Sequence, residues 1–223
     1  MPMNIAIDGP VGAGKSSIAD QVAQRLHILH LDTGAMYRTV ALYMLRNGID
    51  PQDEQTVSAR CGEADVRVAY RDGAQRTMLG EEDVTDLIRT GEVSAAASAI
   101  SKWPAVRRRM VAAQREIAAT ADMLIDGRDI GTVVLPGADV KIFLTASPED
   151  RARRRFDELR KRGQEADYDT VLRDIILRDE HDTRRSAAPL RQAKDALLVD
   201  TTGNSLDESL DVLLETIKER LKA

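Results

Sequence analysis

The sequence predicts an α/β fold with a mostly parallel sheet, and three features support this prediction. Short apolar runs alternate along the chain with segments of helical periodicity, the order typical of strands joined by helices. The apolar runs at 123–126 and 140–144 are those expected of strands covered on both faces. With 223 residues, 43% of them apolar, the chain is long enough for one large domain or for a core with an insert.

The elements follow one another in a regular order. The helix after the first strand turns Ile18, Val22 and Leu26 inward, and the helix at 36–46 is closed by Asn47-Gly48. A last helix carries a stripe of leucine and isoleucine from 206 to 221. The expected strands of one five-stranded sheet are residues 4–8, 28–31, 123–126, 140–144 and 196–200.

One stretch departs from this alternation of strand and helix. Apolar and polar residues alternate over 66–70, Asp72-Gly73 is a hairpin turn signal, and residues 75–79 can return antiparallel. We therefore expect an insert at about 63–101 with a small antiparallel sheet and short helices.

Composition and charge exclude several classes of protein. No apolar run approaches the ~20 residues of a membrane span, and the first residues lack the pattern of a secretory signal. The single cysteine, Cys61, excludes an internal disulfide framework, and the three scattered histidines form no metal cluster. The net charge of −5 argues against a surface devoted to nucleic acid. The cytoplasm is the expected compartment.

Positive charge nevertheless gathers in one segment. Residues 151–162 hold seven basic and two acidic side chains. A local excess of positive charge in an acidic protein suggests a small anionic ligand rather than a long polyanion. The same run also fits the solvated face of a helix.

Residues 9–16, Gly-Pro-Val-Gly-Ala-Gly-Lys-Ser, match the phosphate-loop pattern G-x-x-x-x-G-K-[ST]. Glycine lets backbone N–H groups approach phosphate oxygens closely, and the following helix adds its positive N-terminal end. Lys15 supplies a cation for the β- and γ-phosphates, and the Ser16 hydroxyl can ligate Mg²⁺. A chance match would be only a glycine-rich turn, but this one follows a strand and opens a helix. The sequence therefore predicts nucleotide binding.

Three further polar segments are candidates for binding the molecule that accepts the phosphate. Residues 32–38 follow the second strand, at the sheet edge where α/β proteins bind ligands. Residues 126–132 follow the third, and Asp126 stands where a Walker-B-type carboxylate would organise Mg²⁺. Residues 178–185 lie on an expected helix with Arg178, Asp182 and Arg185 on one face.

Each of these segments also has an ordinary structural explanation. They fit, in turn, a helix cap with a surface arginine, a loop with a local ion pair, and a solvated helix stripe. Several guanidinium groups near a phosphate loop are, however, what phosphoryl transfer requires, because the charge of the transferring group must be neutralised.

These segments, in this order, resemble the bacterial-type cytidylate kinases (CMP kinases) over essentially the whole chain. The phosphate loop is shared by many NTPases, whereas the other landmarks are much more specific. The landmarks are Ile7-Asp8-Gly9-Pro10 and residues 31–38, 126–134, 141–144 and 178–190.

The resemblance implies a P-loop nucleoside-monophosphate kinase fold: a parallel sheet flanked by helices, an inserted small β-sheet region that binds the monophosphate, and an arginine-rich lid. We expect a single domain with its core at about 1–62, 102–150 and 186–223, the insert at about 63–101 and the lid at about 151–185. The implied reaction transfers the γ-phosphate of ATP to CMP or dCMP with Mg²⁺, giving CDP or dCDP for pyrimidine nucleotide metabolism. The implied partners are these nucleotides, with no nucleic acid and no membrane, and the implied state is a monomer.

The resemblance also implies roles for individual residues. Those expected to bind ATP are Gly9, Pro10, Val11, Gly12, Ala13, Gly14, Lys15, Ser16 and Ser17. Those expected to bind CMP are Asp32, Thr33, Tyr37, Arg38, Ser98, Arg107, Arg128, Asp129, Arg178, Asp182 and Arg185. The expected catalytic cations are Lys15, Arg128, Arg151, Arg154, Arg155 and Arg185. The expected Mg²⁺ ligands are Ser16 and Asp126.

Within the CMP set, the resemblance implies that different residues contact the base and the phosphate. Ser98, Arg107 and Asp129 match residues that read the cytosine edge, and Arg38 with Arg128 match those that hold the CMP phosphate. A uracil ring reverses the hydrogen-bonding polarity of this edge, so UMP is expected to be a poor acceptor.

Other functions stay open at this point. A different P-loop kinase, such as an adenylate, guanylate or shikimate kinase, would differ in its acceptor. A nucleotide-dependent switch would hydrolyse ATP or bind a partner without an acceptor, and the chain contains no guanine-reading Asn-Lys-x-Asp motif. An RNA-binding protein would show salt-dependent binding through the arginine run.

Overall fold

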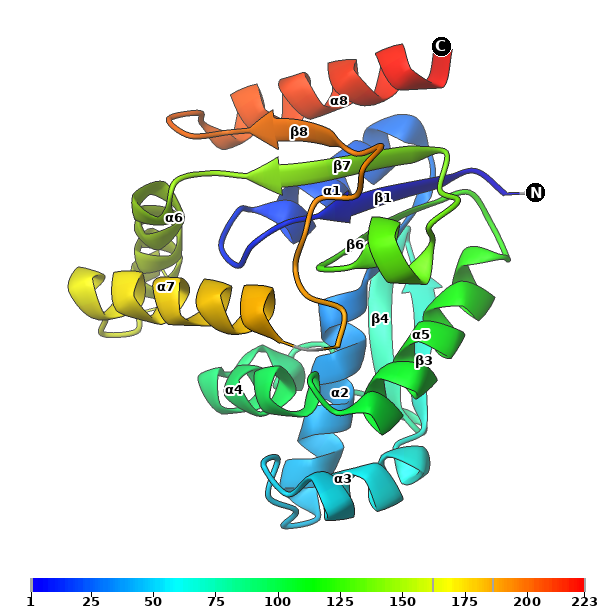
Figure 1. Cartoon of the computed structure of the whole chain (residues 1–223), viewed down its shortest axis with the longest axis vertical. Coiled ribbons are helices and arrows are strands. Elements are labelled where there is room, and N and C mark those ends of the chain that lie inside the picture. Colours follow the sequence, from blue (N-terminus) through cyan, green and yellow to red (C-terminus); the bar gives the residue numbers. More distant parts are fainter. Residues whose placement is uncertain (1, 162, 186, 223) are drawn as a thin grey trace.

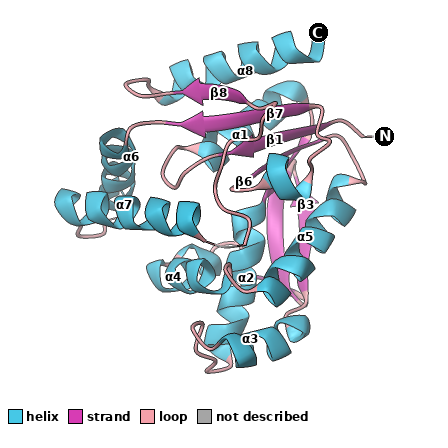
Figure 2. Cartoon of the chain, in the orientation of Figure 1, coloured by secondary structure: helices cyan, strands magenta, loops and turns pink. Residues whose placement is uncertain are grey.

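A five-stranded parallel sheet with the strand order β2-β6-β1-β7-β8 forms the centre of the structure (Figures 1 and 2). The structure is a computed structural model that describes residues 2–161, 163–185 and 187–222. The predicted α/β fold with a five-stranded parallel sheet is confirmed. The strands are β1 (Asn4–Asp8), β2 (Leu29–Asp32), β6 (Met123–Gly127), β7 (Val140–Thr145) and β8 (Leu197–Asp200).

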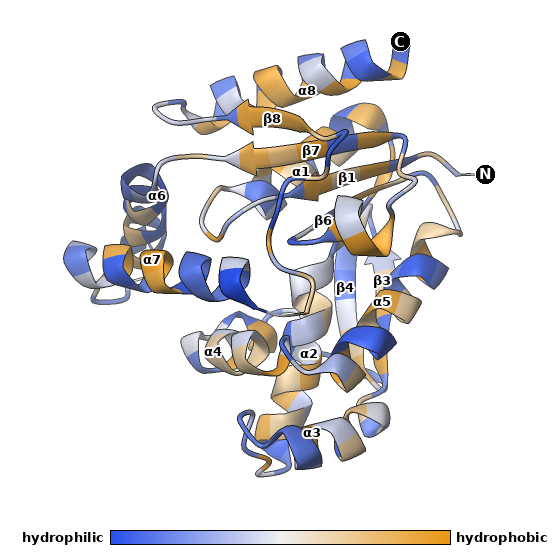
Figure 3. Ribbon diagram, viewed as in Figure 1, coloured by the Kyte–Doolittle hydropathy of each residue, from blue (hydrophilic) through white to orange (hydrophobic). Residues whose placement is uncertain are grey.

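Helices cover both faces of this sheet. On one face α1 (Lys15–Leu26) and α8 (Leu206–Lys222) bury their apolar stripes against Ile5 and Ile7 of β1. On the other, α2 (Thr33–Arg46) and α5 (Pro104–Ala118) pack in a second core that includes Ala6. Successive residues of β1 thus enter opposite cores, which explains why the strands are apolar throughout (Figure 3).

Helix α2 begins three residues earlier than the sequence predicts, at Thr33 rather than at 36. Asp32, the last residue of β2, caps the helix: its side chain accepts a hydrogen bond from the Ala35 N–H at 2.9 Å. The strand therefore passes into the helix with no intervening loop, and residues 32–38 are held rigidly at the carboxyl end of β2.

The predicted antiparallel insert is present. Strand β3 (Val66–Arg71) pairs with β4 (Ala74–Leu79), and β4 pairs with the short β5 (Glu82–Asp83). Asp72 and Gly73 at the hairpin turn both have positive φ, 52° and 78°, as a type I′ turn requires. The other elements of this half are α3 (Glu54–Arg60), 3₁₀ turns at Cys61–Glu63 and Leu87–Arg89, and α4 (Gly91–Ile100).

Two helices project beyond the carboxyl ends of β7 and β8 (Figure 1). They are α6 (Pro148–Lys161) and α7 (Tyr168–Arg184), which share a small core of Ala152, Val171 and Ile175. Hydrophilic residues dominate α6 (Figure 3), which carries most of the predicted basic run. Arg162, the last residue of that run, lies outside the described residues. Within the described part of the chain, no helix is long and apolar enough to span a bilayer.

Candidate active site

The glycine-rich loop connects β1 to α1 with strongly constrained geometry. Gly12 and Gly14 have φ of 75° and 79°, in the left-handed region that favours glycine. Gly9 lies so close to β7 that an added Cβ would stand 2.0 Å from the carbonyl oxygen of Leu144. A residue with a side chain at these positions would deform the loop, so the sequence pattern and the backbone shape agree.

Lys15, the first residue of α1, is folded back onto this loop. Its Nζ donates to the carbonyl oxygen of Pro10 at 2.7 Å, and the residue is 6% exposed. Burial lowers the pKa of Lys15 to about 7, and the nearby positive charge of Arg128 acts in the same direction. An anion bound in the loop would reverse this effect and fix the ammonium charge.

Asp126, at the carboxyl end of β6, accepts a hydrogen bond on each side-chain oxygen. Ser16 Oγ donates to Oδ2 at 2.8 Å, and His30 Nε2 lies 2.9 Å from Oδ1. Burial would raise the pKa of Asp126, but the hydrogen bond and the charge of His30 hold it below its usual value. The carboxylate is therefore ionised and fixed in orientation.

The oxygens of Ser16 and Asp126 suit a hard divalent cation. Mg²⁺ keeps several waters and is usually held by one or two protein oxygens together with substrate phosphates. No group of three or more histidine, cysteine or acidic side chains gathers into a metal site within the described ranges. A hydroxyl and a carboxylate 2.8 Å apart beside a phosphate loop fit Mg²⁺ bound together with a nucleotide.

Residues 32–38 place a second cation at the same sheet edge. Arg38 Nη2 donates to Asp32 Oδ2 at 2.8 Å, while the other oxygen of Asp32 caps α2. The Arg38 Nε is buried without a hydrogen-bond partner among the described residues. Thr33 Oγ1 donates to the Asp126 carbonyl at 2.7 Å, which joins the ends of β2 and β6. Burial raises the pKa of neighbouring Tyr37 to about 12, so its phenol stays neutral.

The loop after β6 and the end of α7 form a chain of alternating charges. Arg107 of α5 makes a buried ion pair with Asp129. Arg185 lies 3.9 Å from both Asp129 Oδ1 and Asp182 Oδ1. Asp182 in turn accepts from Arg128 Nε at 3.0 Å. Segments more than 50 residues apart in the sequence thus converge, as expected from the motifs.

Positive charge exceeds negative charge in this cluster. Burial lowers the pKa of Arg178, and the nearby Arg128, Arg155 and Arg38 lower it further. Several guanidinium groups this close together, with Lys15 beside them, form a site that favours an anion of multiple charge. The five guanidinium groups are Arg38, Arg107, Arg128, Arg178 and Arg185, and the three carboxylates between them are Asp32, Asp129 and Asp182.

The three arginines expected to close over the transferring group differ in their contacts. Arg151 is buried; it donates to the Ala146 and Val11 carbonyls at 2.8 and 3.0 Å, and its Nη2 pairs with Asp179 at 2.6 Å. Arg154 donates to the Thr201 carbonyl at 2.7 Å and to the Ala13 carbonyl at 3.4 Å. These contacts tie α6 to the phosphate loop.

The side chain of Arg155 is 37% exposed. It pairs with Glu158 of its own helix at 2.8 Å, and its charge also acts on Arg178. Ser98 lies on α4, one turn before Ser101, whose carbonyl accepts from Arg107 Nη1 at 3.3 Å. Arg185 follows the last residue of α7; its N–H still donates to the His181 carbonyl at 3.1 Å, and its ψ of 140° turns the chain after it away from the helix.

Sequence reasoning assigns no contact or role to three neighbours of the candidate site. Asp8 accepts the N–H groups of Ile130 and Gly131 at 2.6 and 2.8 Å, and burial raises its pKa to about 6. Gln75 of β4 pairs with the Asp32 main chain, accepting from its N–H at 2.7 Å. His30 is one of three scattered histidines for which the sequence predicts no metal cluster. Asp8 stands in the landmark Ile7-Asp8-Gly9-Pro10, which carries no assigned contact for it, whereas the signal at His30 is a polar residue inside an apolar strand.

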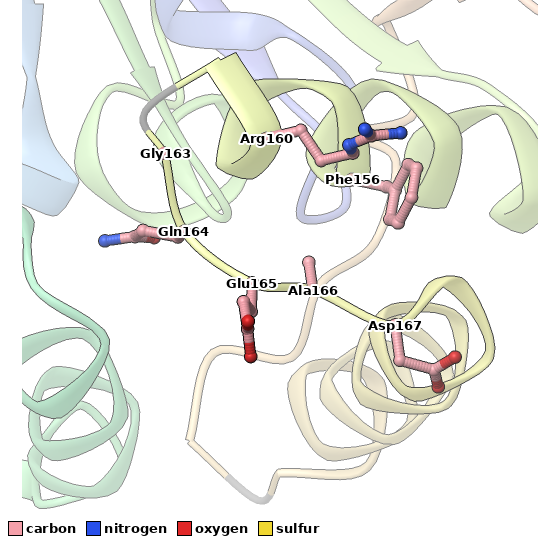
Figure 4. A pocket seen from close by; sticks show the side chains of 7 residues that line it. All are labelled: Phe156, Arg160, Gly163, Gln164, Glu165, Ala166 and Asp167. Atoms are coloured by element: carbon pink, nitrogen blue, oxygen red, sulfur yellow. The ribbon is translucent and has the colours of Figure 1, made fainter.

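Two cavities lie apart from this cluster. One of about 610 Å³ is bounded by Phe156 and Arg160 of α6 and by residues 163–167, which lead into α7 (Figure 4). Another of about 520 Å³ lies beside β8 and α8. Neither is lined by a residue of the predicted site, so the charge cluster and not cavity size identifies the candidate active site.

A parallel sheet with a phosphate loop after β1 and cationic side chains at the same carboxyl edge defines the class of P-loop phosphotransferases. A family model described as cytidylate kinase matches residues 5–219. The chain therefore belongs to the cytidylate kinase family.

Curated relatives agree with this placement, and a solved structure shares the fold. A cytidylate kinase of Carboxydothermus hydrogenoformans is 49% identical over 215 residues, which are 96% of this chain and 97% of that protein. One of Caldicellulosiruptor bescii is 47% identical over 99% of this chain and 97% of that protein. An uncharacterised protein of Eubacterium ventriosum shares the fold at 12% identity, with a TM-score of 0.52 over 97% of this chain and 98% of that one.

Proposed function

We propose that this protein transfers the γ-phosphate of ATP to CMP or dCMP, giving ADP and CDP or dCDP. The observation that carries the proposal is the convergence of Lys15, Arg128 and Arg185 around shared carboxylates at one sheet edge. Family membership across residues 5–219 supports the same reaction.

The phosphate loop would hold the donor. Backbone N–H groups of residues 11–14 and the start of α1 would face the β- and γ-phosphates of ATP. Lys15 would exchange the Pro10 carbonyl for a phosphate oxygen, which is favourable because its buried ammonium lacks an anionic partner within hydrogen-bonding distance among the described residues.

Ser16 and Asp126 would hold Mg²⁺ with the ATP phosphates. The ion, when bound, neutralises charge on the β- and γ-phosphate oxygens. Ser16 would offer its hydroxyl oxygen to the ion, and Asp126 would keep its orientation through His30.

The acceptor phosphate would bind among the guanidinium groups. The Arg38 Nε and the Arg185 Nη2 are buried polar atoms without a hydrogen-bond partner among the described residues. A phosphate oxygen would satisfy them, which removes a desolvation cost of ~1–3 kcal/mol for each. Arg128, 3.0 Å from Asp182, completes this site with its remaining N–H groups.

The chemistry then needs positioning rather than a strong base. The CMP phosphate is already ionised near neutral pH, so its oxygen attacks the γ-phosphorus directly. The bond from that phosphorus to the bridging oxygen breaks, and ADP leaves with the electron pair. The cations hold the two phosphates together in line and offset their repulsion.

Recognition of cytosine would use the buried pair of Arg107 and Asp129 with Ser98. The exocyclic amine of cytosine would donate to the Asp129 carboxylate, and N3 would accept from the Arg107 guanidinium. Uracil presents a carbonyl and an N–H at those positions, which leaves buried groups unpaired at ~1–3 kcal/mol each. This argues for CMP and dCMP over UMP.

Two segments outside the core would move or bind around the substrates. Residues 63–101, approximately, would form a monophosphate-binding insert, and residues 151–185, approximately, would form a lid. Arg155, beside Arg178, is the lid arginine best placed to approach the transferring phosphate. Closure would exclude water and limit wasteful hydrolysis of ATP. The proposed state is a monomer, as the family resemblance implies.

A coupled assay of ADP release tests the proposal. With ATP and Mg²⁺ present, CMP and dCMP should stimulate ADP release strongly, while UMP, AMP and GMP should do so at least ~10-fold less. ADP release that is fastest with AMP or GMP would favour a different nucleotide kinase. Release that no acceptor stimulates would contradict a kinase of this type.

A further inference from the structure

His30 is a buried histidine with no part in the motifs that define the family resemblance. It lies on β2, two residues before Asp32, and is 7% exposed. In the parallel pairing of β2 with β6, His30 is opposite Leu124 and Asp32 is opposite Asp126. The alternation of side chains along a strand therefore places His30 and Asp126 on one face of the sheet. That face is the one covered by α1, because Leu124 packs there against Ile18.

The imidazole bridges two carboxylates from different elements. Nε2 lies 2.9 Å from Asp126 Oδ1, and Nδ1 lies 3.7 Å from Asp20 Oδ1 of α1. An ionised carboxylate can only accept, so the Nε2 carries the hydrogen that joins His30 to Asp126. The Asp20 side chain is 44% exposed and also accepts from Gln24 at 3.0 Å, so it anchors the outer end of the bridge.

This bridge assigns different tasks to the two oxygens of Asp126. The Oδ1 is engaged by His30, and the Oδ2 faces Ser16, the other proposed ligand of the metal. A carboxylate held at one oxygen cannot rotate freely, so its second oxygen stays directed at the cation site.

We propose that His30 is a positioning residue: by donating to Asp126 Oδ1 it holds Oδ2 in place for the divalent cation that accompanies the nucleotide. The inference rests on the proposed function for its metal–nucleotide complex. His30 touches neither substrate nor metal and acts only through Asp126. A histidine with a merely structural role would stabilise the fold and leave metal affinity unchanged.

The test separates the hydrogen bond from the volume of the ring. His30→Leu removes the donor, whereas His30→Gln retains a side-chain N–H able to reach Asp126. His181→Gln is the matched control, because His181 is exposed on α7. Circular dichroism and thermal melting establish whether each variant folds. Asp20→Asn, which changes only the exposed end of the bridge, provides a second test if His30→Leu does not fold.

The readout is the affinity for ADP measured by calorimetry, once in EDTA and once in millimolar Mg²⁺. The ratio of the two dissociation constants reports how strongly protein and metal act together, without turnover. His30→Leu should reduce the tightening by Mg²⁺ by about 10- to 100-fold and leave ADP affinity in EDTA unchanged. His30→Gln should recover most of the tightening of ADP binding by Mg²⁺. Asp20→Asn should lose a smaller part of this tightening than His30→Leu, and His181→Gln should match the wild type.

A Mg²⁺ effect that is the same in His30→Leu and the wild type would overturn the inference, as would a wild type whose ADP affinity does not respond to Mg²⁺. If His30→Leu does not fold, an unchanged Mg²⁺ effect in Asp20→Asn would overturn it. Failure of the proposed function is a separate result, since a protein that does not phosphorylate CMP can still show Mg²⁺-dependent ADP binding that depends on His30.

Discussion

Lys15 shows how burial prepares a single residue for its task. Its pKa near 7 means that the ammonium charge is costly until an anion arrives, so ATP binding and the charge of Lys15 favour each other. We expect Lys15→Ala to lower kcat by about 100-fold or more, because stabilisation of the developing charge is lost. Thermal melting should change little. Turnover close to that of the wild type would contradict the role of the loop.

The buried pair of Arg107 and Asp129 allows a sharper test of stability. Among the residues that the structure describes, replacing Arg107 with Met leaves Asp129 with the more distant Arg185 as its ion-pair partner, 3.9 Å away. We expect a loss of ~3–5 kcal/mol in the free energy of unfolding, measured by urea denaturation. Arg108→Met, at an exposed position of the same helix, should change it by less than ~0.5 kcal/mol. Equal effects of the two substitutions would show that the pair is not a significant stabilising contact.

Asp8 predicts a particular dependence of stability on pH. Burial raises its pKa from 3.8 to about 6, so between these values the folded protein binds more protons than the unfolded chain. The contribution of Asp8 to the free energy of unfolding is therefore fully present below about pH 4 and is lost as the pH rises through about 6. Asp129 and Lys15 are the charged groups that face it.

The comparison with Asp8→Asn isolates this contribution. The free energy of unfolding of the wild type, relative to the variant, should fall by on the order of 3 kcal/mol between about pH 4 and pH 7. Urea denaturation across this range measures it. A difference that stays constant or grows with pH would contradict the assigned burial.

At this scale, local motifs predict candidate residues, but they do not predict the distant contacts that other residues make. Lys15 and Ser16 follow from a local pattern. Asp8 and His30 depend on partners 122 and 96 positions away, and only the folded sheet brings those together. A lone polar residue in an apolar strand carries no information about which distant atom will satisfy it.

Among the elements, α6 is fixed to the phosphate loop by Arg151. Its three contacts reach the loop at Val11, the Ala146 carbonyl before α6, and Asp179 of α7. We expect Arg151→Met to raise KM for ATP by roughly 10-fold and to destabilise the protein by on the order of 3 kcal/mol, because buried acceptors lose their donor.

The control is Arg184→Met, whose side chain is 79% exposed at the end of α7. Steady-state kinetics and thermal melting of both variants measure the effect. Wild-type KM and melting temperature in Arg151→Met would indicate that α6 is held by its apolar contacts alone.

Local turn chemistry predicts elements well when their signals are short-range. The hairpin at Asp72-Gly73 follows from residues that accept positive φ. The start of α2 is predicted three residues late, because the side chain of Asp32 both ends the strand and caps the helix. The contact of Gln75 with Asp32, across 43 positions, has no local signal at all.

For the whole molecule, apolar strands separated by helical segments predict the sheet, since a strand covered on both faces must be apolar throughout. Motifs that end different strands then meet at one edge, because parallel strands place their carboxyl ends together. What the pattern does not contain is the charge network of residues 107–185, which arises when α5, α7 and the loop after β6 fold against one another.

Titration with cytidine and adenosine joined 5′ to 5′ through five phosphates tests most directly that two nucleotides meet phosphate to phosphate at this edge. Calorimetry should show one molecule bound per chain, with a Kd at least ~100-fold below that of ATP alone, since linked groups bind in one step. A linked compound that binds no more tightly than ATP, or CMP that displaces ATP from a single shared site, would contradict the account.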